Sequence, residues 1–329
     1  MKLKTLLPLA LAGAMVAGAA AADDVRIAMV PKSLGNAFFE AARDGGMEAA
    51  KEIGGVEIIF NAPAVVTAEG QIEVINALIA QRVDAIVVSS NDPDALVPIS
   101  KKAMQRGIKV MSFDSAIAPD GRMLHLHPAT APGAAKSMLE MTVDAIGPEG
   151  EIAIVSETPQ STNQNEWIAE MEKLLATEEF SGLKLVQTAY GMGQSDKSYR
   201  ETIALLRRYP DLKAIIAPST VAISAAAKAV EDQGMVGKVY VTGLGLPSEL
   251  AGYVHNGSVK SFAIWNPIDL GYAATYLAYD LIQNDGAKAG DTLDAGRMGS
   301  FTLDDKLETS LPQPFIYDAT NVDEFAEIF

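Results

Sequence analysis

Residues 25–53 read VRIAMVPKSLGNAFFEAARDGGMEAAKEI, and this stretch joins two patterns of different period. Residues 25–30 form a short run of apolar and β-branched side chains, which predicts a buried strand. From residue 38 to residue 53, small and apolar residues recur at intervals of three and four, which predicts a helix lying on a sheet. A strand followed by such a helix is typical of folds built on a parallel β-sheet.

The same alternation continues along the chain and then starts again. The first set has predicted strands at 25–30, 56–60, 84–89, 109–113 and 123–127, with helices at 38–53, 67–81 and 93–106. The second set has strands at 151–156, 184–190, 214–217, 239–243 and 260–265, with helices near 131–145, 163–176, 196–208, 221–233 and 247–256. Each set has the size of one open, doubly wound domain. The sequence therefore predicts an α/β protein of two doubly wound, Rossmann-like lobes with parallel sheets.

The tail after Trp265 is too short to form a third domain. It contains one helical segment, 270–283, and extended segments near 297–303 and 315–319. Because these pieces must complete the existing sheets, we expect the chain to cross between the lobes near His127, Asn266 and Gly296. Several adjacent crossings form a hinge with a cleft beside it. The predicted N-terminal lobe comprises 23–127 plus 267–296, and the C-terminal lobe comprises 128–266 plus 297–329.

The first 22 residues predict a secretory signal peptide. Lys2 and Lys4 precede an apolar run from Leu6 to Val16, and four alanines precede Asp23. The apolar run is too short to span a bilayer. The sequence has no cysteine, which excludes disulfides, zinc–cysteine sites, cysteine nucleophiles and a lipidated cysteine. We therefore expect an exported, soluble protein of the periplasm.

Charge and motifs argue against several other classes of function. The chain has 42 acidic and 26 basic residues and a formal net charge of −16, so nucleic acid and anionic membranes are unfavourable partners. The segment GLGLPS at 243–248 lacks the third glycine of a dinucleotide-binding loop, and no phosphate-binding loop or nucleophile elbow occurs. His125 and His127 share one face of a strand but have no third metal ligand nearby in sequence. We expect no catalytic residue, cofactor or metal site.

Ligands of open parallel sheets bind at the carboxyl ends of the strands, so the residues there are the site candidates. Phe38 and Phe39 are about 100° apart on their helix, so one can face the sheet and the other the cleft. Asp114 could instead cap a turn, and Trp265 could equally pack in the core or stack on a ligand. Amides, hydroxyls and aromatic rings are typical of a carbohydrate site. The candidates are Lys32, Phe38, Phe39, Asn91, Asp114, Asn163, Gln164, Pro218, Thr220, Leu244, Trp265 and Asn266.

Several segments together resemble one family. They are MVPK with FF, SFDS, TNQNEW, IIAP, and VTGLGLP with SFAIWNPIDLGY. Over essentially the whole mature chain, the sequence resembles the periplasmic sugar-binding proteins of ABC importers, which have the type I periplasmic binding protein fold. It is most similar to the rhamnose-binding and autoinducer-2-binding branch. The resemblance implies a monosaccharide captured between two closing lobes and delivered to an ABC permease driven by its ATPase.

The resemblance also implies roles for individual residues. Autoinducer-2 binders grip their ligand with a lysine and an aspartate in the first lobe, and with an Asp-Gln pair, a proline and an alanine in the second. Lys32, Asp114, Gln164 and Pro218 match that set, whereas Asn163 and Thr220 depart from it. An amide both donates and accepts where a carboxylate only accepts, and a threonine adds a hydroxyl. These departures favour L-rhamnose over autoinducer-2, and the methyl group of a 6-deoxy sugar would suit an apolar corner made by aromatic side chains.

Two further classes of function are possible interpretations. A periplasmic sugar-processing enzyme could use Lys32 as a Schiff-base nucleophile beside Asp114, but it would need a lysine pKa lowered by burial, which a neighbouring aspartate opposes. A ligand-sensing regulator is disfavoured by the export signal and by the lack of an N-terminal DNA-binding segment. A chemoreceptor is a further candidate partner of the binding protein, and we expect a monomer.

Overall fold

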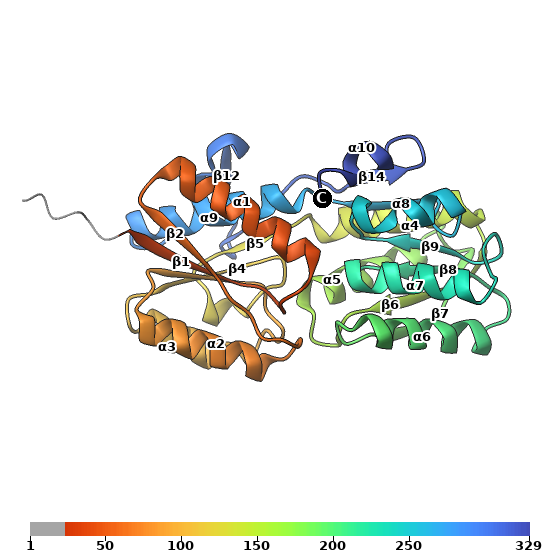
Figure 1. Cartoon of the computed structure of the whole chain (residues 1–329), viewed down its shortest axis with the longest axis horizontal. Helices are drawn as coiled ribbons and strands as arrows, with labels where there is room; N and C mark the ends of the chain where they lie inside the picture. The colour runs from red at the N-terminus through yellow and green to blue at the C-terminus, as the bar shows by residue number, and fades with distance from the viewer. Residues whose placement is uncertain (1–23) are drawn as a thin grey trace, which may run out of the picture.

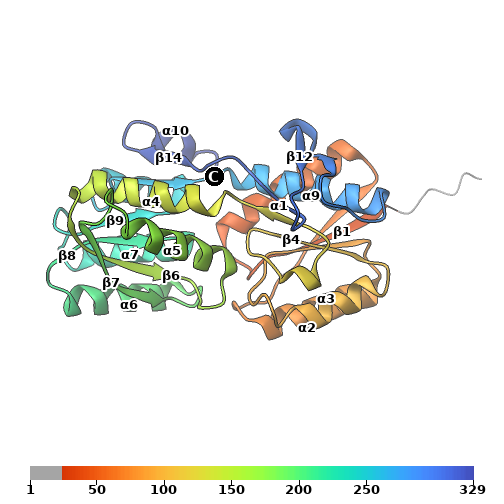
Figure 2. The same ribbon diagram turned by 180° about the vertical axis from the view of Figure 1, so that it is seen from behind.

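The computed structural model describes residues 24–329, and the predicted signal peptide at 1–22 lies outside them. Two α/β lobes lie end to end along the long axis of the molecule (Figures 1 and 2). The predicted fold class is confirmed, since each lobe has a parallel sheet covered by helices. Within residues 24–329, no helix combines the length and apolar composition needed to cross a bilayer.

The first lobe is built on a six-stranded sheet in the order β13-β5-β4-β3-β1-β2, in which every neighbouring pair is parallel. Helices α1 and α9 cover one face of this sheet, and α2 and α3 cover the other (Figures 1 and 2). The strands are β1 (Val25–Val30), β2 (Val56–Phe60), β3 (Ala85–Val88), β4 (Lys109–Phe113), β5 (His125–His127) and β13 (Glu308–Ser310). The helices are α1 (Ala37–Ile53), α2 (Ala68–Gln81), α3 (Val97–Met104) and α9 (Pro267–Gln283).

The second lobe is built on a four-stranded parallel sheet in the order β7-β6-β8-β9. Its strands are β6 (Gly150–Ser156), β7 (Leu183–Tyr190), β8 (Leu212–Ala217) and β9 (Tyr240–Gly243). The fifth predicted strand, β10 (Ser261–Ile264), lies beside β9 without a continuous ladder and pairs antiparallel with β14 (Phe315–Asp318). The helices are α4 (Ala131–Ile146), α5 (Thr162–Leu175), α6 (Ser195–Arg208), α7 (Thr220–Asp232), α8 (Pro247–Asn256) and α10 (Val322–Ala326).

Local chemistry explains where individual elements begin. The side chain of Asn36 accepts a hydrogen bond from the backbone of Phe38 and caps α1, and Thr67 caps α2 in the same way. Helix α3 begins later than the sequence predicts. The Asp92 side chain accepts hydrogen bonds from the backbone of Asp94 and Ala95, which holds that segment in a turn ahead of the helix.

The segment after α9 corrects the predicted assignment of residues 297–329 to the second lobe. Strand β11 (Thr292–Asp294) and strand β12 (Ser300–Thr302) form a hairpin beside α9, and β13 then pairs with β5 of the first sheet. The third crossing therefore lies between β13 and β14, not near Gly296. Only β14 and α10 reach the second lobe, where they pack against β10 and α8.

Polar contacts hold β13, which has no apolar run that could have predicted it. Glu308 pairs with Arg122 and lies 3.0 Å from Nε2 of His127. The hydrogen bond with His127 and the charge of Arg122 lower the pKa of Glu308 to about 2, against the effect of burial. A strand of sequence Glu-Thr-Ser therefore joins the sheet edge through its side-chain ion pairs and its ladder with β5.

Helices α1 and α9 touch backbone to backbone, which fixes α9 to the first lobe. A Cβ atom added at Gly271 would lie 1.7 Å from the carbonyl oxygen of Ala42, and one added at Gly45 would lie 1.8 Å from that of Ile268. The absence of side chains at these two positions thus allows the close approach. Helix α9 follows β10 of the second lobe in the chain, so this packing decides where the second crossing ends.

We predict that Gly271→Ala lowers the free energy of unfolding by about 1 to 3 kcal/mol, because the new methyl group must push the two helices apart. Gly252→Ala in α8 is the matched control, since nothing lies within 4 Å of a Cβ atom added there. The control should be neutral or stabilising by up to about 1 kcal/mol. Urea denaturation followed by circular dichroism measures both. Equal stabilities of the two variants would contradict the close packing of α1 against α9.

Candidate functional site

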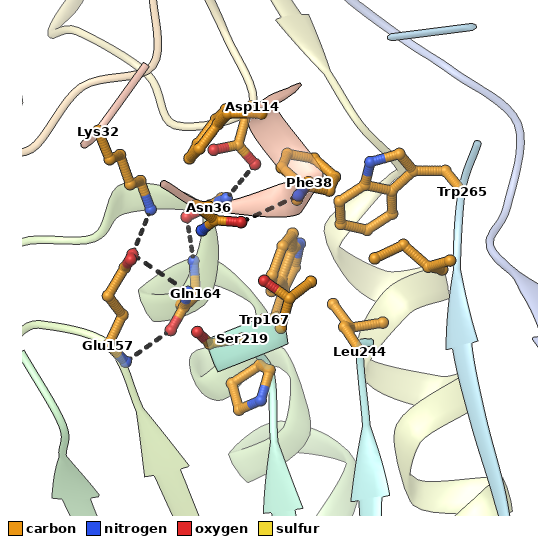
Figure 3. A pocket seen from close by; sticks show the side chains of 15 residues that line it. Lys32, Asn36, Phe38, Asp114, Glu157, Gln164, Trp167, Ser219, Leu244 and Trp265 are labelled. Atoms are coloured by element: carbon orange, nitrogen blue, oxygen red, sulfur yellow. Dashed lines mark hydrogen bonds and ion pairs between the residues drawn. The ribbon is translucent and has the colours of Figure 1, made fainter. Parts of the chain in front are cut away.

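A cavity lies between the lobes and is shown in Figure 3. Residues of both lobes form its wall. They are Lys32, Asn36, Phe38, Phe39, Asp114, Glu157, Asn163, Gln164, Trp167, Pro218, Ser219, Thr220, Leu244, Ile264 and Trp265.

The structure brings most of the predicted candidates together at this wall. Lys32, Phe38, Phe39, Asp114, Asn163, Gln164, Pro218, Thr220, Leu244 and Trp265 all line the cavity. All but Trp265, which follows β10, come from loops at the carboxyl ends of parallel strands and from the first turns of the helices that follow. This is the position where open α/β sheets bind ligands.

Two candidates are not at the wall. The amide of Asn91 donates hydrogen bonds to the backbone oxygens of Lys32 and Thr67, at 2.9 and 3.1 Å, and so fixes the loop that carries Lys32. The side chain of Asn266 accepts a hydrogen bond from the backbone of Ile268 and caps α9 at the second crossing. Both residues support the site from outside.

Asp114 is held in an uncommon backbone conformation at the end of β4. Its φ angle is 58°, in the left-handed region, where aspartate is one of the few side chains found regularly. The hydroxyl of Ser89 donates to Oδ2 of Asp114 at 2.6 Å, and the Asp114 backbone N–H donates to Leu126. The carboxylate is thereby directed to the cavity by contacts from both neighbouring strands, β3 and β5.

Three polar contacts join the two lobes around the cavity. Nζ of Lys32 lies 2.5 Å from Oε2 of Glu157, and the amide of Asn163 donates to Oδ1 of Asp114 at 2.8 Å. Beside them, the Thr162 hydroxyl donates to the backbone oxygen of Ala116 at 3.0 Å. In each contact one partner belongs to the first lobe and the other to the second. The lobes are therefore closed over the cavity.

Electrostatics keep the lysine charged. Burial lowers the pKa of Lys32, but the charges of Glu157 and Asp114 and the hydrogen bond to Glu157 outweigh it, so the pKa is raised. Burial raises the pKa of Asp114, against the charge of Lys32 and the hydrogen bond from Ser89. A charged ammonium is a hydrogen-bond donor, whereas a Schiff-base nucleophile needs the neutral amine.

An aromatic cluster forms the apolar part of the wall. Phe38 packs edge-on against Phe39 and Trp265, with ring centroids 5.1 and 6.0 Å apart, and Trp265 lies 5.6 Å from Trp167. Both phenylalanines line the cavity, so the expectation that only one would face the cleft is corrected; Phe39 also packs on Phe113 of β4. Trp265 is buried among these rings and also lines the cavity, so it packs in the core, and its stacking on a ligand stays a prediction.

Five lining residues were not among the candidates. Glu157 directly follows strand β6, so the same strand-end rule that found Lys32 and Asp114 identifies it. Trp167 lies one helical turn after Gln164 on α5, and Ser219 stands between Pro218 and Thr220. The remaining two, Asn36 and Ile264, carry no sequence signal for a binding role.

His125 and His127 take part in a network of polar contacts within the first lobe. Their rings pack edge to face with centroids 4.2 Å apart. Nδ1 of His125 lies 2.9 Å from the Ser112 hydroxyl, and His127 contacts Glu308. Among residues 24–329, no group of three or more histidine, aspartate or glutamate side chains is arranged to hold a metal ion.

A family model described as a periplasmic binding protein domain matches residues 27–288. The chain belongs to this family. The D-ribose/D-allose-binding protein of Pseudomonas aeruginosa is 30% identical over 227 residues, which cover 66% of this chain and 70% of that protein.

Solved structures of the family superpose closely on this periplasmic binding protein. An ABC transporter solute-binding protein of Clostridium phytofermentas with bound L-rhamnose is 34% identical, with a TM-score of 0.89, covering 93% of this chain and 99% of the other. LsrB of Clostridium saccharobutylicum in complex with AI-2 has a TM-score of 0.87 at 23% identity, covering 92% and 99% of the two chains. At that identity, the likeness to LsrB concerns the fold alone.

The predicted resemblance to the periplasmic sugar-binding proteins of ABC importers is confirmed. These proteins bind their substrates and do not convert them, so this chain is a substrate-binding protein and not an enzyme. A periplasmic location follows from the family.

Tryptophan fluorescence should report occupation of the cavity. Both tryptophans of the chain, Trp167 and Trp265, line it. We predict that a ligand filling the cavity changes the intensity or wavelength of the emission, and that Trp167→Phe and Trp265→Phe each remove part of the change. Titration of the same ligand into N-acetyltryptophanamide is the control. Unchanged emission while calorimetry detects saturation would show that the ligand binds elsewhere.

Proposed function

We propose that the mature protein captures a neutral monosaccharide, L-rhamnose in particular, in the cavity between its lobes and delivers it to an ABC permease driven by an ATPase. Export to the periplasm would depend on the signal peptide at residues 1–22. The observation that carries the proposal is a cavity between the lobes whose first-lobe side offers Lys32 and Asp114 and whose second-lobe side offers Asn163 and Gln164, beside an aromatic wall.

The donors and acceptors of this cavity match a polyol. An ammonium donates three hydrogen bonds, a carboxylate only accepts, and an amide does both, so hydroxyl groups can pair with each of them. The rings of Phe38 and Trp265 cover the opposite side and suit the apolar face of a sugar or a methyl group. A small ligand with both polar and apolar faces therefore fits better than a wholly apolar one.

Binding would favour closure because the ligand contacts both lobes at once. A ligand with equal affinity for the open and closed forms cannot shift the equilibrium between them. Lys32 and Asp114 stand on one lobe, and Gln164 and Pro218 on the other. Simultaneous contacts with both sets exist only in the closed form, which supports a capture mechanism in which the closed form docks on the permease.

The amide at position 163 supports rhamnose over autoinducer-2. Asn163 donates to Asp114 at 2.8 Å, and its own oxygen accepts from the backbone of Gln164. An aspartate at this position could not donate, and it would place a second carboxylate against Asp114. Thr220 adds a hydroxyl where an alanine is expected. The related Clostridium phytofermentas protein that holds L-rhamnose is 34% identical to this chain, which also supports this ligand.

An autoinducer-2-binding protein of the same fold is the second candidate. Lys32, Asp114, Gln164 and Pro218 are the residues that favour it, because they match the set expected in such binders and all line the cavity. A periplasmic binding protein selective for autoinducer-2 would need Asn163 and Thr220 to be compatible with that smaller ligand.

Isothermal titration calorimetry with L-rhamnose, D-ribose, D-galactose and autoinducer-2 tests which of these ligands the protein prefers. We expect L-rhamnose to bind the mature protein most tightly of the four. Asp114→Asn should weaken rhamnose binding by about 1 to 3 kcal/mol, because it removes a charged acceptor and alters the contact with Asn163. Asp120→Asn is the matched control, since this carboxylate is exposed, pairs with Lys101 and does not line the cavity.

Two outcomes would contradict the proposal. Absence of rhamnose binding at millimolar concentration would rule out this sugar as the ligand. Tighter binding of autoinducer-2 than of rhamnose would select the second candidate. Equal loss of affinity in the Asp114 and Asp120 variants would instead show that Asp114 does not contact the ligand.

A further inference from the structure

Glu157 occupies a position in the cavity that the match to autoinducer-2 binders does not assign. It follows strand β6, lines the cavity and is 5% exposed. Its Oε2 atom lies 2.5 Å from Nζ of Lys32, accepts from the Ser161 hydroxyl at 3.0 Å and lies 3.4 Å from the Gln164 amide nitrogen. Figure 3 shows the Glu157 side chain directed at Lys32 from the opposite lobe.

The wall of the cavity has more acidic side chains than basic ones. Of the residues that line the cavity, Lys32 is the only cation, while Asp114 and Glu157 are both carboxylic acids. Glu157 takes one of the three N–H donors of the ammonium, which leaves two for ligand oxygens. The positive charge of Lys32 therefore already has a buried counterion at hydrogen-bonding distance.

Neutral and acidic ligands would meet this arrangement differently. The hydroxyl groups of a neutral sugar can donate to the carboxylates and accept from the remaining N–H groups, so no charge needs a new partner. An acidic sugar would bring a further negative charge close to two carboxylic acids and an ammonium that is already paired. In a buried site such repulsion is weakly screened, so it disfavours the anion strongly.

We propose that Glu157 is a specificity-determining residue that makes the closed site reject acidic sugars, such as aldonates and uronates, by pairing with Lys32. This inference rests on the proposed function as a monosaccharide-binding protein. Glu157 could instead serve only as a contact that holds the lobes together. In that case its replacement would weaken the binding of neutral and acidic ligands to the same extent.

Calorimetry at fixed ionic strength separates these roles. The ligand pairs are L-rhamnose with L-rhamnonate and D-galactose with D-galacturonate, and the proteins are wild type, Glu157→Gln and Glu151→Gln. Glu151 stands at the other end of β6 and pairs with the exposed Lys184 at 2.9 Å, so its replacement removes the same charge outside the cavity. In Glu157→Gln, the new amide side chain keeps the size of glutamate and an oxygen acceptor for Lys32.

We expect Glu157→Gln to bind the acidic member of a pair at least about tenfold more tightly than wild type does, while the neutral member changes by less than about tenfold. Glu151→Gln should behave as wild type. If the Glu157→Gln protein does not melt cooperatively, Glu157→Met removes the same charge with a side chain of similar volume and replaces it in the test.

Each outcome bears on the inference. Wild-type protein that binds an acidic sugar as tightly as its neutral counterpart overturns it, as does a neutralised variant that gains no affinity for either acid. If wild type binds none of the neutral sugars but the neutralised variant gains affinity for an acid, the rhamnose proposal fails and the role of Glu157 stands. If wild type binds rhamnose and the variant loses affinity equally for neutral and acidic sugars, the rhamnose proposal stands and the specificity role of Glu157 fails.

Discussion

The ion pair between Lys32 and Glu157 joins the carboxyl ends of two parallel sheets across the cleft. Both side chains are almost fully buried, so each charge depends on the other for its stability in a poorly solvated environment. The contact requires the lobes to be closed, because one partner stands on each. Together with the hydrogen bond from Asn163 to Asp114, it defines the polar half of the cavity and sets the charge that a ligand meets there.

The path of the chain allows the lobes to approach each other as units. The chain passes between them after β5, after β10 and after β13, and the side chain of Gln313 in the third segment donates to the Thr130 hydroxyl in the first at 2.7 Å. Helix α9 is fixed to α1 by contact between the two backbones, so the second crossing ends in a rigid element. Motion is therefore expected in the connecting segments, while each sheet keeps its helices.

Much of the fold follows from patterns in the sequence. Runs such as AIVV in β3 and IAMV in β1 are buried on both faces, and that burial produces the apolar runs from which strands are predicted. Strand β13 could not be found in this way, since Glu-Thr-Ser is polar and depends on Glu308 finding Arg122 and His127 far away in sequence. The assignment of residues 297–310 to the second lobe was wrong for this reason.

The site was predictable to a similar degree. The strand-end rule identified Lys32 and Asp114, because the topology of a parallel sheet alone brings such residues to one edge. It could not distinguish a residue that faces the cavity from one that supports it, as Asn91 does through the backbone of Lys32. A crystal structure of the mature protein with L-rhamnose is the most direct test. We predict sugar oxygens within hydrogen-bonding distance of Lys32 or Asp114 on one lobe and of Asn163 or Gln164 on the other. A sugar that contacts one lobe only, or that lies outside the cavity, would contradict binding between the two closing lobes.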